Sequence, residues 1–238
     1  MDFDIKDLLK IHAHKAAEYM SNFVNDHFSR NTVMIQDITK PEISDRKLVE
    51  TYQYLAMIIA DQIKQVEKET SFYHTCTNKC VHCCYQAIFI TSDETKIITH
   101  WIKHHLDSRS VNDLKRKLKS WTALFYKSGF TKGYDGSIEF KQRYFNAHLA
   151  CPFLNNKSCS IYPVRPTVCR FYFSYDEPRL CSQSAIVENT LDGEPWRQAL
   201  LPQLVLLRES VTMDVSLFET YQDTQLTLLP IAVKQTLN

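Results

Sequence analysis

The chain has 238 residues, with 44% hydrophobic and 23% charged side chains, which are proportions of an ordinary globular protein with a sizeable core. Its formal net charge of +1 provides no general attraction for nucleic acid or anionic membranes, so we expect neither as a partner. No apolar run approaches the ~20 residues of a membrane span. The first four residues include two aspartates and do not resemble the basic start of a signal peptide, which favours a cytoplasmic protein.

Two amphipathic helices are predicted at the start of the chain. Over residues 3–28, apolar side chains recur at steps of three and four residues. A second helix is expected over 45–69, after a polar break that ends at Pro41. A short connection of this kind predicts an antiparallel hairpin. The buried stripe of the second helix is predicted to be Leu48, Tyr52, Leu55, Ala56, Ile59, Ile63 and Val66.

Further helices are indicated by capping signals. The apolar run 87–90 is expected to be buried, as a strand or as the start of a helix. Thr91 with Glu94 has the spacing of a capping box, and Ser110 with Asp113 repeats it. We therefore predict one helix that begins after Thr91 and another that begins after Ser110, with Gly129 as the C-terminal cap of the second.

The rest of the chain is less regular. Residues 137–150 give no clear assignment, and 151–181 contain four prolines, which predicts mostly irregular structure. Closing helices are expected over 202–209 and 213–221. An irregular segment of this length inside a compact domain needs something that holds it, and a bound metal is the economical candidate.

All eight cysteines of the chain fall in two groups. In a reducing cytosol, clustered cysteines indicate metal or redox chemistry more often than structural disulfides, although an even count would allow four disulfides. The first group lies within nine residues and the second is spread over the proline-rich segment. The predicted metal ligands are Cys76, Cys80, Cys83, Cys84, Cys151, Cys159, Cys169 and Cys181.

Four thiolates suit either structural zinc or a [4Fe–4S] cluster. Eight thiols are enough for two such sites, or for one site plus thiols that do redox work. The spacing of Cys76, Cys80 and Cys83 allows three sulfurs to converge on one centre. The adjacent Cys83 and Cys84 are expected to point apart, so that one of them could face a second centre with the downstream cysteines.

For other polar residues near the cysteines we expect roles other than metal ligation. Arg165, Arg170 and Tyr162 are expected to hydrogen-bond to the sulfurs from outside the metal shell and to offset the thiolate charge. Lys79, Lys157 and Arg179 lie nearby as well, and for the last two an ordinary surface role is equally reasonable. A role in packing or at the surface is preferred over metal ligation for His12, His14, His74, His82, His100, His104 and His105.

The cysteine pattern resembles that of a known family. Cys-x3-Cys-x2-Cys-Cys, followed by Cys-Pro-Phe-Leu and Cys-Ser-Ile-Tyr-x2-Arg-Pro-x2-Cys-Arg, is similar to the YkgJ-type CxxCxxCC cysteine-cluster family. The resemblance covers roughly residues 76 to 181 and implies a zinc- or iron-chelating domain. The three residues between Cys76 and Cys80 depart from the family, which often has two. A related branch, the flagellin lysine N-methylases, implies an iron–sulfur cluster, S-adenosylmethionine and a protein or peptide substrate.

A competing motif overlaps the first group. Cys76-x3-Cys80-x2-Cys83 is also the spacing of radical S-adenosylmethionine enzymes, which use a β/α barrel and glycine-rich cofactor contacts. The chain has only four glycines and little β/α alternation, which disfavours that class. The scarcity of glycine also argues against a P-loop or a Rossmann nucleotide site.

The sequence therefore predicts a mainly α protein, a helical bundle-like domain around an irregular, cysteine-rich metal-binding core. We expect a helical hairpin over 1–72, the cysteine cluster over 73–185 and a helical segment over 186–238, packed as one unit. The predicted function is chelation of an iron–sulfur cluster or zinc, in support of a protein modification such as lysine N-methylation. Two alternatives are a structural zinc module for interactions and a thiol-based sensor of metal or redox state.

Overall fold

The computed structural model describes residues 44–77, 79–130, 137–188, 190–191 and 226–237, together with five isolated helical positions before residue 20. The hairpin predicted for the first 72 residues has its first helix, 3–28, almost wholly outside these ranges. The helices predicted over 202–209 and 213–221 lie entirely outside them. The division into three segments stays a prediction.

The longest helix, α2 (Asp45–Thr70), confirms the second predicted helix. Ser44 caps it by accepting a hydrogen bond from the Lys47 amide, and Ser71 ends it in the left-handed conformation. Every residue of the predicted stripe is buried, with no more than 6% of any of them exposed. Because the apolar side chains follow the helical period, one face of α2 packs on the core while charged side chains cover the other.

Helix α3 (Ser92–His105) begins at the predicted capping box. The Thr91 side chain accepts a hydrogen bond from the Glu94 amide, and the Glu94 carboxylate accepts one from the Thr91 amide. The apolar run before it is strand β1 (Phe89–Ile90), which pairs antiparallel with β6 (Thr227–Leu228) near the end of the chain. The chain end is thereby tied to the centre of the molecule.

Helix α4 (Ser108–Lys127) is present, but its predicted start at Ser110 is wrong. Asp107 is the N-cap, and its carboxylate Oδ1 accepts a hydrogen bond from the Ser110 amide nitrogen at 2.7 Å. A capping residue must precede the helix by one position to reach the amide of the first turn, and Ser110 is already helical. Gly129 follows the helix at φ +82°, which confirms the predicted C-terminal cap.

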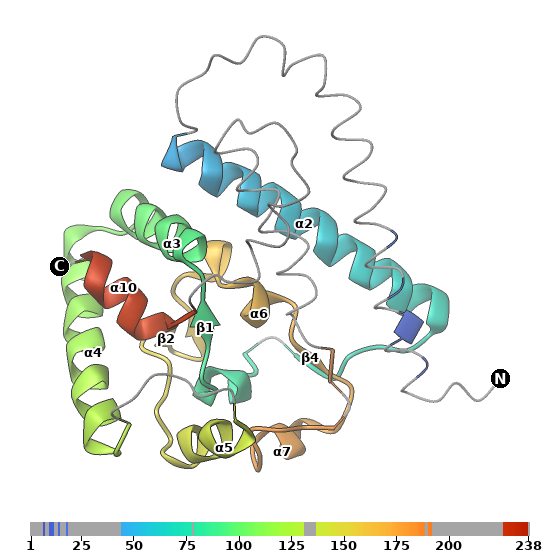
Figure 1. Ribbon diagram of the computed structural model, residues 1–238. Coiled ribbons are helices and arrows are strands. Elements are labelled where there is room, and N and C mark those ends of the chain that lie inside the picture. The colour runs from blue at the N-terminus through green and yellow to red at the C-terminus, as the bar shows by residue number, and fades with distance from the viewer. Residues whose placement is uncertain are drawn as a thin grey trace, which may run out of the picture.

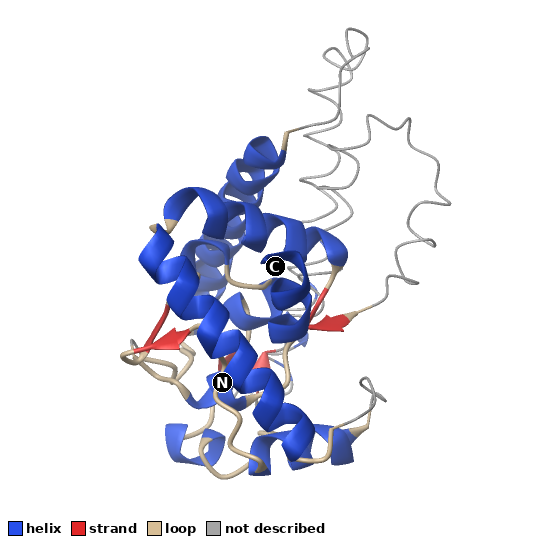
Figure 2. Cartoon of the chain, turned by 90° about the vertical axis from the view of Figure 1, so that its left-hand side faces the viewer, coloured by secondary structure: helices blue, strands red, loops and turns tan. Residues whose placement is uncertain are grey.

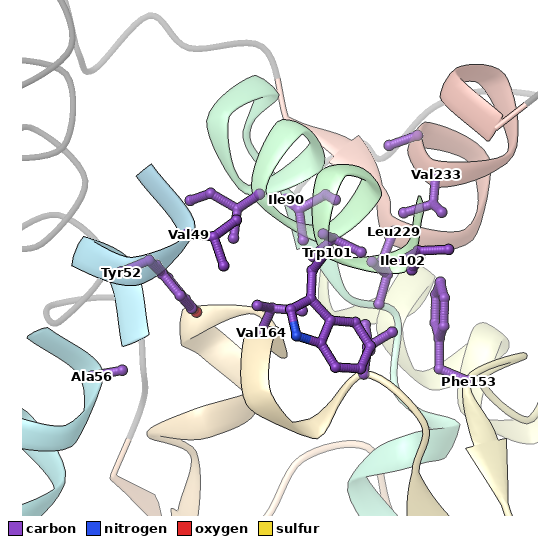
Figure 3. Packing of buried hydrophobic residues seen from close by; sticks show 14 of the residues in the cluster. Val49, Tyr52, Ala56, Ile90, Trp101, Ile102, Phe153, Val164, Leu229 and Val233 are labelled. Atoms are coloured by element: carbon purple, nitrogen blue, oxygen red, sulfur yellow. The ribbon is translucent and has the colours of Figure 1, made fainter. Parts of the chain in front are cut away.

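Besides the four-residue helices of the cysteine-rich segment, two longer helices of the described residues were not predicted. They are α5 (Ile138–Asn146), which Ser137 caps, and α10 (Leu229–Leu237), which packs against α3 and α4 (Figure 1). The main core lies between α2, α3, α10 and the cysteine-rich segment (Figure 3). A second, largely aromatic cluster joins α4 to α5 and consists of Trp121, Phe125, Phe130, Phe140, Tyr144, Leu149 and Leu228.

The cysteine-rich segment contains only short elements, as the prolines predicted. None of the elements from 151 to 191 is longer than four residues, and Figure 2 shows helices dominating the described chain, with few and short strands. A mainly α fold around an irregular core is thus confirmed. The described helices include none with the length and apolar content needed to cross a bilayer. The short elements are η1 (His82–Tyr85), β2 (Leu154–Asn155), β3 (Ser158–Cys159), η2 (Tyr162–Val164), α6 (Thr167–Arg170), β4 (Phe173–Ser174), α7 (Pro178–Cys181) and β5 (Thr190–Leu191).

Candidate metal centre

The fold brings the two cysteine groups together. The amide of Cys151 donates a hydrogen bond to the carbonyl of Cys84 at 2.8 Å, so the beginning of the second group lies against the end of the first. Cys83 and Cys84 are in the short helix η1, and the Cys84 amide donates to the carbonyl of Val81 at 2.9 Å. All eight cysteines are half-buried, and none forms a disulfide.

Short turns present the downstream cysteines. Strands β2 and β3 form a tight hairpin in which Cys159 pairs with Leu154. Asn156 and Lys157 make its turn with φ values of 48° and 61°, the left-handed conformation that a two-residue hairpin turn requires. Lys157 is exposed in this turn, in keeping with a surface role. Cys169 lies in α6, of which Pro166 is the N-cap residue.

Buried side chains of α2 and α3 hold the backbone on either side of the cysteines. Glu94, which is 1% exposed, accepts the amide of Thr167 at 2.9 Å, two residues before Cys169. Glu67, which is 4% exposed, accepts the amide of His74 at 3.0 Å, two residues before Cys76. Both carboxylates thus satisfy backbone donors of otherwise irregular segments.

A third anchor comes from Tyr52. Its hydroxyl donates to the carbonyl of Arg165 at 2.6 Å, and Figure 3 shows its ring directed from α2 toward the loop that contains Val164. Sequence reasoning placed Tyr52 and Glu94 in the scaffold and gave neither a role near the site. In the sequence, the one sign of such a role is a polar side chain on a helix face that is otherwise apolar. Such a side chain needs a hydrogen-bond partner when it is buried.

Electrostatic interactions show which thiols are neighbours. In addition to burial, negative charge on Cys83 raises the pKa of Cys151, Cys159 and Cys169. The pKa of Cys84 is raised by its hydrogen bond with Cys83 and by burial, and also by charge on Cys151 and Cys169. Cys76 interacts instead with Cys80 and Cys181, and also with Cys83. We call the first set the inner cysteine group: Cys83, Cys84, Cys151, Cys159 and Cys169. The outer cysteine group is Cys76, Cys80 and Cys181.

The prediction that Cys83 and Cys84 point apart is wrong. The two thiols share a hydrogen bond, which lowers the pKa of Cys83 to about 7 and raises that of Cys84. The neighbours occupy a single turn of 3₁₀ helix, which leaves their sulfurs within reach of each other. Burial raises the pKa of Cys151 to about 12, and burial also raises that of Cys169. Cys83 is therefore the inner thiol that ionises most readily.

Two arginines face the inner group. The pKa of Cys83 is lowered mainly by the hydrogen bond from Cys84 and also by the positive charge of Arg165. For Cys159, burial raises the pKa, and the charges of Arg165 and Arg170 oppose that increase. Arg170 Nη2 donates to the carbonyls of Tyr162 and Pro163 at 2.9 and 3.0 Å. The guanidinium carbons lie 4.5 Å (Arg165) and 5.8 Å (Arg170) from the centre of the Tyr162 ring.

The same arginines leave buried donors without acceptors. The Nε atoms of Arg165 and Arg170 are buried and have no hydrogen-bond partner. A buried N–H on a charged group normally finds an acceptor, because leaving it unpaired costs stability. Thiolate sulfur is an acceptor of the right charge, so these donors and the adjacent thiols together fit the needs of a metal–thiolate centre.

The thiols do not form a finished coordination shell. Among the described residues, which include every cysteine, no three or more His, Cys, Asp or Glu side chains make a group that could hold a metal ion. Metal binding would therefore require these thiols to turn toward one point. The cysteines outside loops lie in elements of four residues or fewer.

Several histidines pack against other side chains, whereas His82 directly precedes Cys83 in η1. The His100 ring stacks on His104 at 4.0 Å and lies 3.6 Å from a carboxylate oxygen of Asp45. His105 stacks on Trp101, and His74 stacks on Phe173 at 4.5 Å with its Nδ1 buried and unpaired. These contacts agree with the packing role preferred from the sequence. His12 lies outside the described residues.

A helical scaffold that presents an irregular, thiol-rich segment defines a cysteine-cluster protein. Residues 75–187, just under half of the chain, match the model of the CxxCxxCC family, which is described as "Putative zinc- or iron-chelating domain". The family resemblance of the cysteine spacing is thereby confirmed for this segment, and with it metal binding as the function of the domain. No curated protein and no solved structure matches the chain.

Proposed function

We propose that the inner cysteine group binds zinc or an iron–sulfur cluster as thiolates. The observation that carries this proposal is the hydrogen bond of 2.8 Å between Cys151 and Cys84, which joins two cysteine groups that are distant in the sequence. It supports a single centre with ligands from both groups. Four of the five inner thiols would complete a tetrahedral zinc site or hold a [4Fe–4S] cluster.

Charge balance supports the same centre. Four thiolates around Zn²⁺ carry two net negative charges, and the guanidinium groups of Arg165 and Arg170 supply two positive ones. When bound, the metal would hold the two cysteine groups in place. The protein's own contribution would be to bind it, to screen its charge and to donate hydrogen bonds to sulfur from the unpaired Nε atoms.

Metal and acid-labile sulfide analysis of protein purified without oxygen tests the proposal. Iron with sulfide and a broad visible absorption band would identify a cluster, and zinc with a featureless visible spectrum would identify a tetrathiolate site. Cys169→Ser is expected to lower the metal content, because that thiol lies in the inner group. Cys181→Ser serves as the matched control in the outer group. A folded wild-type chain without metal would overturn the proposal.

The finer functions remain predictions. S-adenosylmethionine binding, a lysine N-methylase activity on a protein or peptide, an interaction module and a redox sensor all follow from the sequence alone. Equilibrium dialysis with S-adenosylmethionine on metal-loaded protein tests the first two, and reversible metal loss on peroxide treatment tests the sensor. A cytoplasmic location is likewise a prediction.

A further inference from the structure

A small basic pocket lies between α4 and α10, on helices outside the cysteine-rich segment. Figure 1 shows α10 beside α4, and Figure 2 turns the face with α4 toward the viewer. The pocket has a volume of about 310 Å³, which is at the lower end of the range for small-molecule sites. Its lining consists of Lys115, Arg116, Lys119 and Lys234 with Leu118 and Leu237.

Three of the four cations of this pocket have no acidic partner among the described residues. Arg116 pairs with Asp113 at 3.0 Å, and Asp113 is shared with Lys117 at 3.2 Å. No ion pair is formed by Lys115, Lys119 or Lys234 within the described ranges. The whole chain has a net charge of only +1, so this concentration of positive charge is local. Cations that converge without an acid repel each other, and a bound anion would relieve that repulsion.

The geometry also indicates what kind of anion would fit. Leu118 and Leu237 are 1% and 4% exposed, so most of the exposed lining belongs to the side chains of the three lysines and Arg116. No aromatic side chain lines the pocket, whereas proteins that bind single-stranded nucleic acid stack its bases on aromatic side chains. Lysine ammonium groups bind phosphate as point charges, and several of them favour an oxyanion with more than one negative charge.

We propose that the pocket between α4 and α10 binds a small multivalent oxyanion of the phosphate or pyrophosphate class. Lys115 and Lys119 contact it from successive turns of α4, and Lys234 contacts it from the last turn of α10. The half-buried Lys234 has less freedom than the two exposed lysines and therefore loses less entropy on binding. The site is independent of the metal centre, because it shares no residue with either cysteine group.

Titration calorimetry with pyrophosphate on the full, metal-loaded chain tests this inference. The triple variant Lys115→Gln, Lys119→Gln, Lys234→Gln is expected to lower the affinity by about tenfold or more, since three charge-assisted contacts are lost. The matched control removes three exposed lysines of other helices, with Lys68→Gln, Lys103→Gln and Lys141→Gln, and is expected to bind like the wild type. Circular dichroism confirms that both variants are folded.

Two further measurements separate the alternatives. Metal content is determined before and after titration, because pyrophosphate can chelate a metal, and binding that persists in the triple variant overturns the proposal. A single-stranded oligonucleotide of ~16 residues, the longest site of one nucleic-acid-binding module, is titrated in parallel. Tighter binding of the oligonucleotide through the same lysines would assign the pocket to nucleic acid and also overturn the proposal. Saturable pyrophosphate binding lost only in the triple variant supports it.

Discussion

At the scale of single residues, the scaffold controls the site through three buried polar groups. Tyr52, Glu67 and Glu94 lie on apolar helix faces, where an unpaired polar atom would be costly. Each is paired with a backbone group of a cysteine-bearing segment, at Arg165, His74 and Thr167. Helix periodicity could assign these residues to a buried face, but their partners are distant in the sequence and follow only from the tertiary fold.

Glu94→Ala is expected to destabilise the protein by about 2 kcal/mol or more, since two buried amides, of Thr91 and Thr167, lose their acceptor. Urea denaturation measures the change. Glu50→Ala is the control, because Glu50 is exposed and pairs only with Arg46 on the same helix, so its loss is expected to cost less than about 0.5 kcal/mol. Equal effects of the two substitutions would contradict the assigned role of Glu94.

Arg165→Gln and Arg170→Gln are each expected to weaken metal binding by about 10- to 100-fold, the usual effect of removing a hydrogen-bond partner of a metal ligand. Competition against a chelator of known affinity measures this change. Arg179→Gln is the control, because the exposed Arg179 pairs with Glu177. The sequence predicted roles for Arg165 and Arg170 near the sulfurs, and unchanged affinity in both variants would remove that interpretation.

At the scale of elements, local signals predicted helices well where capping and periodicity agreed. The capping box of Thr91 and the glycine after α4 lie as expected. Helix α5 was missed because aromatic and charged residues alternate along it, although Ser137 is an N-cap. Helix α10 was not predicted, and Pro230 in its first turn is compatible with it, because proline there loses no hydrogen bond. Its position depends on the pairing of β6 with β1, which no local pattern shows.

The start of α4 can be tested with a pair of substitutions. Asp107→Ala is expected to lower the free energy of unfolding by about 1 kcal/mol, because its carboxylate caps the helix. Ser110→Ala is expected to change it by less than about 0.5 kcal/mol, since Ser110 is an exposed residue inside the helix. Thermal or urea unfolding distinguishes the two. A larger loss of stability for Ser110→Ala than for Asp107→Ala would instead support a helix that begins after Ser110.

At the scale of the whole molecule, the helices provide the stability and the cysteine-rich segment provides the chemistry. The main core is shared by α2, α3 and α10 with apolar side chains of the cysteine-rich segment, among them Phe153, Ile161 and Phe171, so packing as well as bound metal would hold that segment to the helices. The sequence could identify all the thiols because metal ligands are recognised by residue type and spacing. It could not divide them into inner and outer groups, since that division depends on how the two cysteine segments meet at Cys84 and Cys151.

The same division predicts how metal binding depends on pH. Hydrogen bonding from Cys84 lowers the pKa of Cys83, while burial raises the pKa of Cys151 to about 12 and also raises that of Cys169. Cys83 therefore ionises more readily than a free thiol, and the buried thiols of Cys151 and Cys169 ionise less readily. A metal that binds thiolates must displace protons from these thiols, so affinity is expected to rise with pH and binding is expected to release protons.

Zinc competition assays between about pH 6 and 8 measure the slope, and calorimetry in buffers of different ionisation enthalpy measures the protons released. Cys83→Ser removes the most readily ionised inner thiol, so the variant is expected to bind more weakly at every pH. The outer-group variant Cys181→Ser is expected to keep the wild-type slope. An affinity independent of pH would mean that the ligands are already ionised, and the burial of Cys151 and Cys169 would then not govern metal uptake.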